Sequence, residues 1–376
     1  MDATCLTTSG FWESDTCHVM VNDRDKAAIA QSEILRPWCE GNDELRGCVL
    51  FSTSGSTSDG KWVALSRRAL LASAQAVNEH LEVTGNDHWL LALPTFHVGG
   101  MGIIARANLA SCGLSHYQDA WDAQKFHQTL ENKVTLTSLV PTQLTDLVAA
   151  GLNAPDSLRA VLIGGGALDD DTYQKAIELG WPVIETYGMT EASSQIATAS
   201  VTDRKLKLLP CWQARTDDSG ILSIKGDPML TSRLAVCHGQ VISEPVLRDG
   251  WFATSDRVEL VEGCLVFKGR SDRCIKILGE LVDLADIEKQ WQSLSAGVSF
   301  VVVAMPDQRK GSRLLICTEN CADAGVFQKK LDEYNQACNP VARIDCVRDV
   351  DVFPRSDLGK IRYQKLIEIL QGDKLK

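Results

Sequence analysis

A loop rich in glycine, serine and threonine, with a lysine at its end, is the first segment whose residues could perform chemistry. It runs from Ser52 to Lys61, directly after an expected strand. Backbone amides, hydroxyls and one ammonium in such a loop can bind a polyphosphate. Gly55 to Lys61 matches the beginning of a Walker A motif, but Trp62 stands where that motif needs a Mg²⁺-binding hydroxyl. Residues 63–66 read as a strand, so we predict a hairpin whose loop folds over phosphates, with a flexible surface turn as the alternative.

A second segment, Glu185 to Glu191, places an aromatic ring, a glycine, a hydroxyl and a carboxylate at the end of an expected strand. Tyr187 can stack on a base and Thr190 can reach a phosphate. Glu191 can hold the Mg²⁺ that accompanies ATP, because hard oxygen ligands suit that ion. The alternative is a capped turn, with Thr190 as the N-cap and Glu191 as an acid in the first turn.

Three further segments offer groups suited to nucleotide chemistry. The turn Gly164 to Ala167 follows an expected strand, and its missing side chains let a flat ring approach the backbone, unless it is a plain β-to-α turn. Trp251 to Asp256 precedes the short run Arg270 to Asp272. Lys360 lies in a glycine-containing loop near the C-terminus, where a solvated surface lysine is the alternative.

The elements that must position these segments alternate between strands and helices in the first half of the chain. The expected strands are 48–52, 89–93, 134–140, 158–163 and 182–186. The expected helices are 67–82, one from about 100, 141–150 and 169–179. One or two short helices are expected before them, in the first 45 residues. This alternation predicts an α/β fold class with a mostly parallel sheet and ligand sites at the carboxyl ends of its strands.

The second half of the chain has a different pattern. After residue 209 the expected strands are short and separated by hairpin turns: 221–225, 251–253, 258–261 and 265–268. From Ser271 onward, strands and helices predict a small α+β unit of a size typical for a domain. We therefore place a boundary near Arg270, with a large N-terminal domain over residues 1–270 and a small C-terminal domain over 271–376.

The composition excludes several classes of partner. Of 376 residues, 44% are hydrophobic and 23% charged, which is ordinary for a globular protein. The net charge of -11 repels nucleic acid and anionic lipid, so local groups must hold any anionic ligand. Thirteen cysteines without a C-x-x-C spacing, and a polar start without a signal peptide, predict a cytoplasmic protein with free thiols. No apolar run reaches the ~18 residues that a membrane span needs.

In their order along the chain, these segments resemble the adenylate-forming acyl-CoA synthetases and their adenylation-domain relatives. The shared motifs read STSGSTSDGK, GGGA, YGMTE, WFATSD, GRSDRCIK and PRSDLGKI, and the resemblance covers about residues 48–365. It implies a large adenylation domain, a small mobile C-terminal domain and two half-reactions. An acid and ATP form an acyl-AMP and pyrophosphate, and a thiol then displaces AMP. ATP and Mg²⁺ are thus the implied cofactors, with coenzyme A as co-substrate.

The same resemblance spreads the nucleotide-binding residues over several motifs. Asp256 accepts the ribose hydroxyls and Arg270 also contacts the ribose, while Thr190 and Glu191 meet the α-phosphate and Mg²⁺. The other implied cofactor-binding residues belong to the phosphate loop, the turn and tyrosine that flank adenine, and the face that touches the pantetheine arm of coenzyme A: Thr53, Ser54, Gly55, Ser56, Thr57, Gly60, Lys61, Gly165, Gly166, Tyr187 and Gly279.

The resemblance also implies that Lys360 bridges the substrate carboxylate and the α-phosphate. Two anions meet in adenylation, so a cation between them holds them in line and neutralises developing charge. The thioester step does not need this lysine, and the family turns its small domain on a hinge, here Asp272, between the two steps. Lys360, Thr190 and Glu191 are the predicted catalytic residues, and Glu191 is the predicted metal ligand.

Within this superfamily, the run from Leu93 to Arg106 is most similar to the o-succinylbenzoyl-CoA synthetases of menaquinone or phylloquinone biosynthesis. That acid has two carboxylates, of which only the succinyl one is activated, so the pocket needs a polar anchor for the other. Arg106 can provide a charge-assisted contact, His97 can line or gate the pocket, and Ser194 and Gln195 can add hydrogen bonds. The alternatives are a helix-surface arginine for Arg106 and a packed aromatic before a glycine turn for His97.

The chain departs from the family pattern in two places. About 50 residues precede the phosphate loop, fewer than is typical, which leaves a homo-oligomer or a smaller acid pocket open. Ser255 stands where the family usually has glycine, and Lys205 to Arg215 has no assigned role. The leading hypothesis is an ATP-dependent o-succinylbenzoate–CoA ligase with small-molecule partners only. The alternatives are a ligase for another aryl or short-chain acid, an adenylation module that loads a carrier protein, and a nucleotide-binding relative without catalysis.

Overall fold

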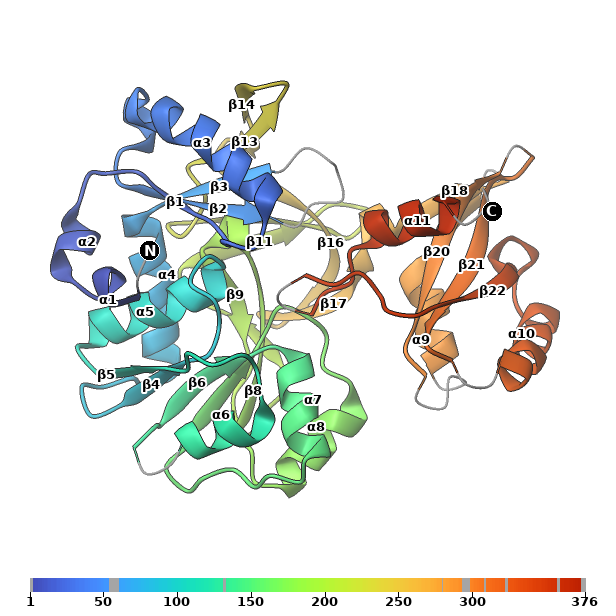
Figure 1. Ribbon diagram of the computed structural model, residues 1–376, viewed down its shortest axis with the longest axis horizontal. Coiled ribbons are helices and arrows are strands. Elements are labelled where there is room, and N and C mark those ends of the chain that lie inside the picture. The colour runs from blue at the N-terminus through green and yellow to red at the C-terminus, as the bar shows by residue number, and fades with distance from the viewer. Residues whose placement is uncertain are drawn as a thin grey trace. The chain divides into compact units, whose positions relative to one another are not determined.

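The computed structural model forms two compact units (Figure 1). It describes residues 3–53, 61–130, 133–278, 280–292, 298–307, 309–321, 324–356 and 359–372. The large unit contains Met1–Arg215, Ser223–Ala253 and Leu260–Val266. The small unit contains Thr216–Leu222, Thr254–Glu259 and Phe267–Lys376. The domain boundary expected near Arg270 stays a prediction.

Alternating helices and strands form the centre of the large unit. In chain order they are α4 (Arg67–His80), β4 (His88–Leu91), α5 (Val98–Ala110), β5 (Gly113–His116), α6 (Ala123–Thr129), β6 (Leu136–Leu139), α7 (Pro141–Ala149), β7 (Ala160–Ile163), α8 (Asp170–Glu178) and β8 (Val183–Met189). The five strands run parallel in the order β5-β4-β6-β7-β8. Helices lie on both sides of them, α4 and α5 on one side and α6, α7 and α8 on the other (Figure 1). These five strands confirm the predicted parallel arrangement, and they form part of a twelve-stranded sheet that continues antiparallel from β8 to β9 (Ser194–Thr198).

A buried core joins three of these helices to the sheet. Val161 and Ile163 of β7 pack in one apolar cluster with Phe126 of α6, Leu144 of α7 and Ala176 of α8. Successive side chains of a strand point to opposite faces, and both faces of this sheet carry helices. That is why β7, with the sequence AVLI, reads as a continuous apolar run.

The N-terminal region holds more structure than the one or two short helices expected there. It contains α1 (Ala3–Leu6), α2 (Ser9–Glu13), β1 (His18–Met20), α3 (Lys26–Glu40) and the 3-10 turn η1 (Asp43–Leu45). The buried stripe of α3 is Ala28, Ser32, Leu35 and Cys39, at helical spacing. Because half of this stripe consists of small or polar residues, the sequence showed only weak periodicity. The carboxylate of Asp25 caps the helix by accepting from two backbone amides.

The remaining strands up to residue 270 pair mainly antiparallel. They are β2 (Cys48–Thr53), β3 (Lys61–Ser66), β9 (Ser194–Thr198), β10 (Leu206–Leu208), β11 (Trp212–Thr216), β12 (Ile221–Gly226), β13 (Ser232–Cys237), β14 (Gln240–Glu244), β15 (Leu247–Arg248), β16 (Trp251–Val261) and β17 (Cys264–Arg270). A five-stranded sheet has the order β1-β2-β3-β13-β14, and β8, β9 and β10 pair in sequence. The two strands expected around Asp256 are in fact one, β16, because its polar motif lies inside a strand.

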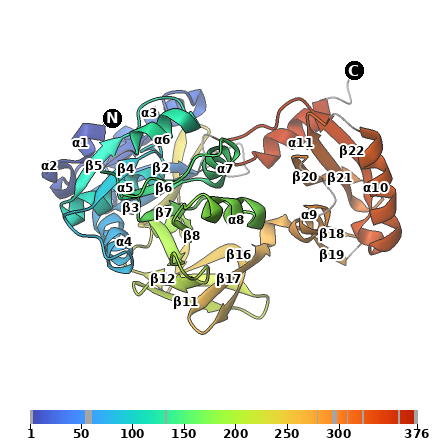
Figure 2. The same cartoon turned by 90° about the horizontal axis from the view of Figure 1, so that it is seen from below.

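The small unit contains a three-stranded sheet with helices on both faces (Figure 2). Its elements are η3 (Ser271–Arg273), β18 (Cys274–Ile277), β19 (Glu280–Asp283), α9 (Leu284–Gln292), β20 (Phe300–Asp307), β21 (Gly311–Glu319), α10 (Ala324–Ala337), η4 (Pro340–Ala342), β22 (Ile344–Val350) and α11 (Tyr363–Gly372). Val302 of β20 packs with α9 and α10, whereas its neighbours Val301 and Val303 pack with α11. None of the helices in the described residues is long and apolar enough to cross a membrane.

Candidate active site

The segment expected to hold phosphates is flanked by the two paired strands of a hairpin. Strands β2 and β3 pair antiparallel, with Thr53 opposite Lys61, and the Thr53 hydroxyl donates to the Lys61 carbonyl at 3.2 Å. The strand after Lys61 confirms the predicted hairpin, because a Walker loop would continue into a helix. The expected phosphate contacts of Ser54, Gly55, Ser56, Thr57 and Gly60 lie outside the described residues.

The glycine turn expected to flank adenine lies at the carboxyl end of β7, next to β8. The Thr186 hydroxyl donates to the Ile163 carbonyl at 3.1 Å, and a Cβ on Gly164 would approach that hydroxyl oxygen to 2.6 Å. Gly165 has a φ of +82° and is exposed, as is Gly166. Tyr187 follows Thr186 in β8 and is half-buried. Two of the expected adenine-binding segments therefore meet at one edge of the sheet, as the carboxyl ends of parallel strands do.

The turn after β8 carries the expected catalytic hydroxyl and carboxylate. Thr190 and Glu191 lie in the 3-10 turn η2 (Thr190–Ala192), and both are half-buried. The N-cap position belongs to Met189 without a side-chain bond, so the alternative in which Thr190 is the cap is wrong. The chain turns tightly here, because a Cβ on Gly188 would overlap the backbone carbonyl of Ser194. The hydroxyl and carboxylate thus project from a rigid strand end.

Backbone hydrogen bonds bring this turn beside the phosphate hairpin. The Leu230 amide donates to the Glu191 carbonyl at 2.9 Å, and the Thr231 amide donates to the Ala64 carbonyl of β3 at 2.8 Å. Two consecutive residues therefore bridge η2 and β3. The oxygen groups at Thr190 and Glu191 suit Mg²⁺, which prefers hard oxygen ligands.

Arg106 is a buried cation. Its residue is 2% exposed on α5, so the helix-surface alternative is wrong. The guanidinium carbon lies 5.5 Å from the centroid of the Trp89 ring, in cation–π contact. Its Nε is buried without a hydrogen-bond acceptor, and no carboxylate among the described residues forms an ion pair with it. Burial lowers the pKa of Arg106 to about 10, so the group remains charged at neutral pH.

Of the other residues expected in the acid pocket, Ser194 lies near the Arg106 guanidinium. A Cβ placed on Gly102 would be 3.2 Å from Arg106 Nη2 and 3.7 Å from Ser194 Cβ. Gln195 is buried, and its side-chain oxygen accepts from the Thr198 hydroxyl at 2.7 Å. That bond gives the Gln195 oxygen a structural partner within β9.

His97 occupies the N-cap position of α5. Its ring is half-buried and 4.7 Å from the ring of Phe96. The glycines after His97 lie in the first turn of α5, and glycine is required at residue 100 because a Cβ there would lie 2.3 Å from the Pro94 carbonyl oxygen. Both hypotheses for His97, a residue that lines the acid pocket and a packed aromatic, agree with this position.

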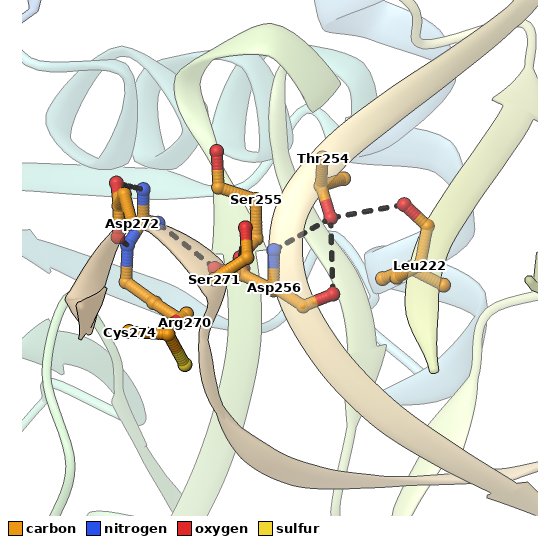
Figure 3. A network of polar contacts seen from close by, with 8 residues as sticks. All are labelled: Leu222, Thr254, Ser255, Asp256, Arg270, Ser271, Asp272 and Cys274. Carbon is orange, nitrogen blue, oxygen red and sulfur yellow. Dashed lines mark hydrogen bonds and ion pairs between the residues drawn. The ribbon is translucent and has the colours of Figure 1, made fainter. Parts of the chain in front are cut away.

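In the small unit, one arginine joins the expected ribose carboxylate to the expected hinge (Figure 3). Arg270 Nη1 lies 2.8 Å from Asp256 Oδ1, and its Nε and Nη2 donate to both oxygens of Asp272 at 2.9 and 2.6 Å. Asp256 is 5% exposed, and its amide is held by the Thr254 hydroxyl at 3.0 Å. Ser255 offers its backbone carbonyl to the Ser271 hydroxyl. A glycine could do the same, so this departure leaves the network intact.

Lys360 lies at the end of a tight loop in the small unit. The Ser356 amide donates to the Lys360 carbonyl at 2.7 Å, and Arg355 pairs with Ile361 across the loop base. Lys360 is exposed, in agreement with the solvated-surface alternative, yet partial desolvation and the charge of Arg270 lower its pKa, and Asp256 opposes them. Gly279, expected to touch coenzyme A, lies outside the described residues.

Three residues around Arg106 were not predicted from the sequence. Trp89 provides the ring under the guanidinium, Asn78 donates to the Arg106 carbonyl at 3.0 Å, and Gly102 leaves space beside it. One feature of the sequence indicates that Arg106 is buried. The helix containing Arg106 is apolar on every face, and the only charge in such a helix is expected to be buried with it.

Five parallel strands with glycine-rich and hydroxyl-rich turns at their carboxyl ends are typical of a nucleotide-binding α/β protein. The AMP-binding enzyme family matches residues 13–219, more than half of the chain, and the chain belongs to this family.

Two curated relatives carry the same name. The 2-succinylbenzoate–CoA ligase of Enterococcus faecalis is 31% identical over 70% of this chain and 57% of its own length. The 2-succinylbenzoate–CoA ligase of Listeria monocytogenes serovar 1/2a is 29% identical over 90% of this chain and 72% of its own. The chain therefore spans less than two thirds of the Enterococcus relative.

Solved structures share the fold. Wild-type E. coli MenE with a bound m-phenylether-linked analogue of OSB-AMS is 26% identical, with a TM-score of 0.67 over 88% of this chain and 70% of that one. The o-succinylbenzoate CoA synthetase (MenE) of Bacillus subtilis, in complex with the acyl-adenylate OSB-AMP, is 24% identical, with a TM-score of 0.72 over 85% and 68%. The predicted fold class is confirmed.

Proposed function

We propose that this chain is an ATP-dependent acid–CoA ligase that activates o-succinylbenzoate, in menaquinone or phylloquinone biosynthesis. The observation that carries the proposal is the buried charge of Arg106, which has no carboxylate partner among the described residues. A buried, unneutralised guanidinium is costly unless a ligand anion pairs with it. The names of the relatives agree with this acid.

The chemistry of o-succinylbenzoate matches such a group. Its succinyl carboxylate reacts, and its ring carboxylate remains free to accept two parallel hydrogen bonds from a guanidinium. Trp89 is fully buried, and its ring supports the Arg106 guanidinium through cation–π contact. An acid without the second carboxylate would leave the arginine unpaired, so the site favours diacids.

In the first half-reaction, a succinyl carboxylate oxygen attacks the α-phosphorus of ATP, and the bond to the β-phosphate oxygen breaks. The Lys360 ammonium holds the two anions in line and neutralises charge as pyrophosphate leaves. Thr190 and Glu191 offer a hydroxyl and a carboxylate at the α-phosphate. Mg²⁺, when bound with ATP, offsets phosphate charge, and Glu191 would hold it.

In the second half-reaction, the thiol of coenzyme A gives up its proton, its sulfur attacks the acyl carbonyl carbon and AMP leaves. Asp256 and Arg270 would retain the ribose through both steps. Asp272 would act as the hinge between them, and Gly279 would contact the pantetheine arm. We place the reaction in the cytoplasm, in agreement with the absence of disulfides among the cysteines.

Thioester formation from ATP, coenzyme A and a panel of acids tests the proposal. The panel contains o-succinylbenzoate, benzoate, acetate and a medium-chain fatty acid, with Lys360→Ala as control. We expect turnover of o-succinylbenzoate alone, lost in the control. Turnover of only the other acids would assign a different ligase, transfer to a carrier protein but not to coenzyme A would indicate an adenylation module, and ATP binding without AMP formation would indicate a binding protein.

A further inference from the structure

We propose that Gly102 is a specificity-determining residue, because the space left by its missing side chain sets the position of the Arg106 guanidinium. This inference rests on the proposed function and names the feature that selects an acid with a second carboxylate. Gly102 itself touches no substrate and acts through Arg106.

A glycine in the middle of a buried helix requires a reason. Residues 100–107 of α5 are all buried, and glycine costs about 1 kcal/mol relative to alanine at an interior helical position. At Gly100 the reason is the backbone, since a Cβ would collide with the Pro94 carbonyl oxygen. At Gly102 the nearest atoms are two of the Arg106 guanidinium and one of the Ser194 side chain.

Helix geometry explains why Arg106 occupies this space. Residues four apart lie on one face of a helix, and their side chains lean toward its N-terminus. The Arg106 side chain therefore passes over residue 102, and Nη2 would lie 3.2 Å from a Cβ there. The Trp89 ring lies 5.5 Å from the guanidinium carbon. The guanidinium thus has contacts with α5 and with the indole.

A methyl group at residue 102 would displace this group. A carbon–nitrogen distance of 3.2 Å is closer than ordinary van der Waals contact, so Nη2 must move by several tenths of an ångström or the guanidinium must rotate. Paired hydrogen bonds between a guanidinium and a carboxylate depend on the orientation of the two planar groups. The shift would weaken binding of the ring carboxylate, while the reacting succinyl carboxylate remains unaffected.

The test compares two acids that differ only in the ring carboxylate: o-succinylbenzoate and 4-oxo-4-phenylbutanoate. We measure the ratio of their kcat/KM values in wild type, in Gly102→Ala and in Gly99→Ala. Gly99 is the matched control, because a Cβ there would meet only the flexible end of the Leu93 side chain, at 3.3 Å. We expect Gly102→Ala to lower the ratio ~10-fold or more, with the KM for ATP unchanged, and Gly99→Ala to leave it within about twofold.

A double-mutant cycle with Arg106→Lys keeps the inference testable if Gly102→Ala alone folds poorly. The smaller ammonium relieves the crowding, so alanine at residue 102 should change the ratio by less than about twofold in that background. An unchanged ratio in folded Gly102→Ala, or an equal drop in both backgrounds, would overturn the inference alone. A wild-type protein that does not turn over o-succinylbenzoate would overturn the proposed function and the inference with it.

Discussion

Desolvation acts on two cations of this protein with different consequences. Arg106 begins from so high a pKa that burial leaves it at about 10, and the group stays charged at neutral pH. Lys360 begins closer to neutrality, so the lowering of its pKa brings the loss of its proton nearer to working conditions. The arginine therefore suits a permanent anchor for an anion, and the lysine suits a charge whose presence depends on pH.

We expect the adenylation rate to fall as pH rises through the lowered pKa of Lys360, because the neutral amine no longer attracts the two reacting anions. ATP–pyrophosphate exchange between about pH 6 and about pH 10 measures this limb. Lys360→Arg stays charged throughout and should lack the limb, whereas Lys360→Ala should be slower by ~100-fold or more at neutral pH. A wild-type profile that stays flat to the alkaline end would contradict the assignment.

Replacing Arg106 should separate stability from function. Arg106→Met removes an unpaired buried charge and keeps much of the volume, so we expect the free energy of unfolding to stay level or to rise by about 1–2 kcal/mol. The same variant should lose ~100-fold or more in kcat/KM for o-succinylbenzoate. Urea unfolding and steady-state kinetics on one preparation give both numbers. A marked loss of stability would mean that the arginine is structural.

At the level of the elements, one carboxylate holds the amino ends of the parallel strands together, away from the predicted site. Asp87, directly before β4, accepts from the Thr135 hydroxyl before β6 at 2.8 Å and from the guanidinium of Arg159 before β7 at 2.7 and 2.9 Å. Burial alone would raise its pKa, but Arg159, the Thr84 amide and Thr135 together hold the pKa of Asp87 at about 2.

We expect Asp87→Asn to lower the free energy of unfolding by about 2 kcal/mol at neutral pH without changing the KM for ATP. Because the folded-state pKa lies below the ordinary value, this contribution is complete above about pH 5 and is lost as pH falls toward 2. The gap between wild type and variant in denaturant unfolding should therefore shrink from pH 7 to about pH 3. A gap that is constant with pH would show that packing, rather than charge, is responsible.

How far the elements could be predicted depended on the spacing of their apolar residues. Helix α7, predicted over 141–150, spans Pro141–Ala149, because a proline begins it and the buried Leu144 and Leu147 recur at helical spacing. Helix α3 was not predicted from the sequence, since an alanine and a serine make up half of its buried stripe. The polar motif around Asp256 was predicted to separate two strands, although hydroxyl and carboxylate groups can project from one continuous strand.

Some site residues could likewise be placed from the local sequence, and others could not. The glycine turn and η2 follow directly from their strands, so local sequence sufficed to place them at one edge of the sheet. The burial of Arg106, by contrast, arises from contacts between α5 and Trp89 of β4, which only the folded chain brings together.

At the scale of the whole molecule, the residues predicted to act in adenylation belong to both units. Thr190 and Glu191 are in the large unit and Lys360 is in the small one. Each unit has its own buried core, which is the condition for two bodies to move without unfolding. The hinge at Asp272 stays a prediction.

Asp272→Pro should test the hinge. Asp272 lies in the 3-10 turn η3, whose backbone angles proline can adopt, so the variant keeps this conformation and restricts others. We expect thioester formation from preformed acyl-AMP to slow ~10-fold or more, and pyrophosphate exchange to change less. Asp272→Ala removes the same ion pair with Arg270 without restricting φ, and serves as control. Equal slowing of both steps in the proline variant would argue against a hinge here.

The bridge between η2 and the phosphate hairpin contains two main-chain bonds, from the amides of Leu230 and Thr231, beside a side-chain bond from the Cys48 thiol to the Thr231 hydroxyl. A main-chain bond survives replacement of either side chain by any residue except proline. The two amide donors therefore remain in place when these side chains change. Part of the geometry of the site can in this way be inherited by sequences that have diverged as far as this chain and its relatives.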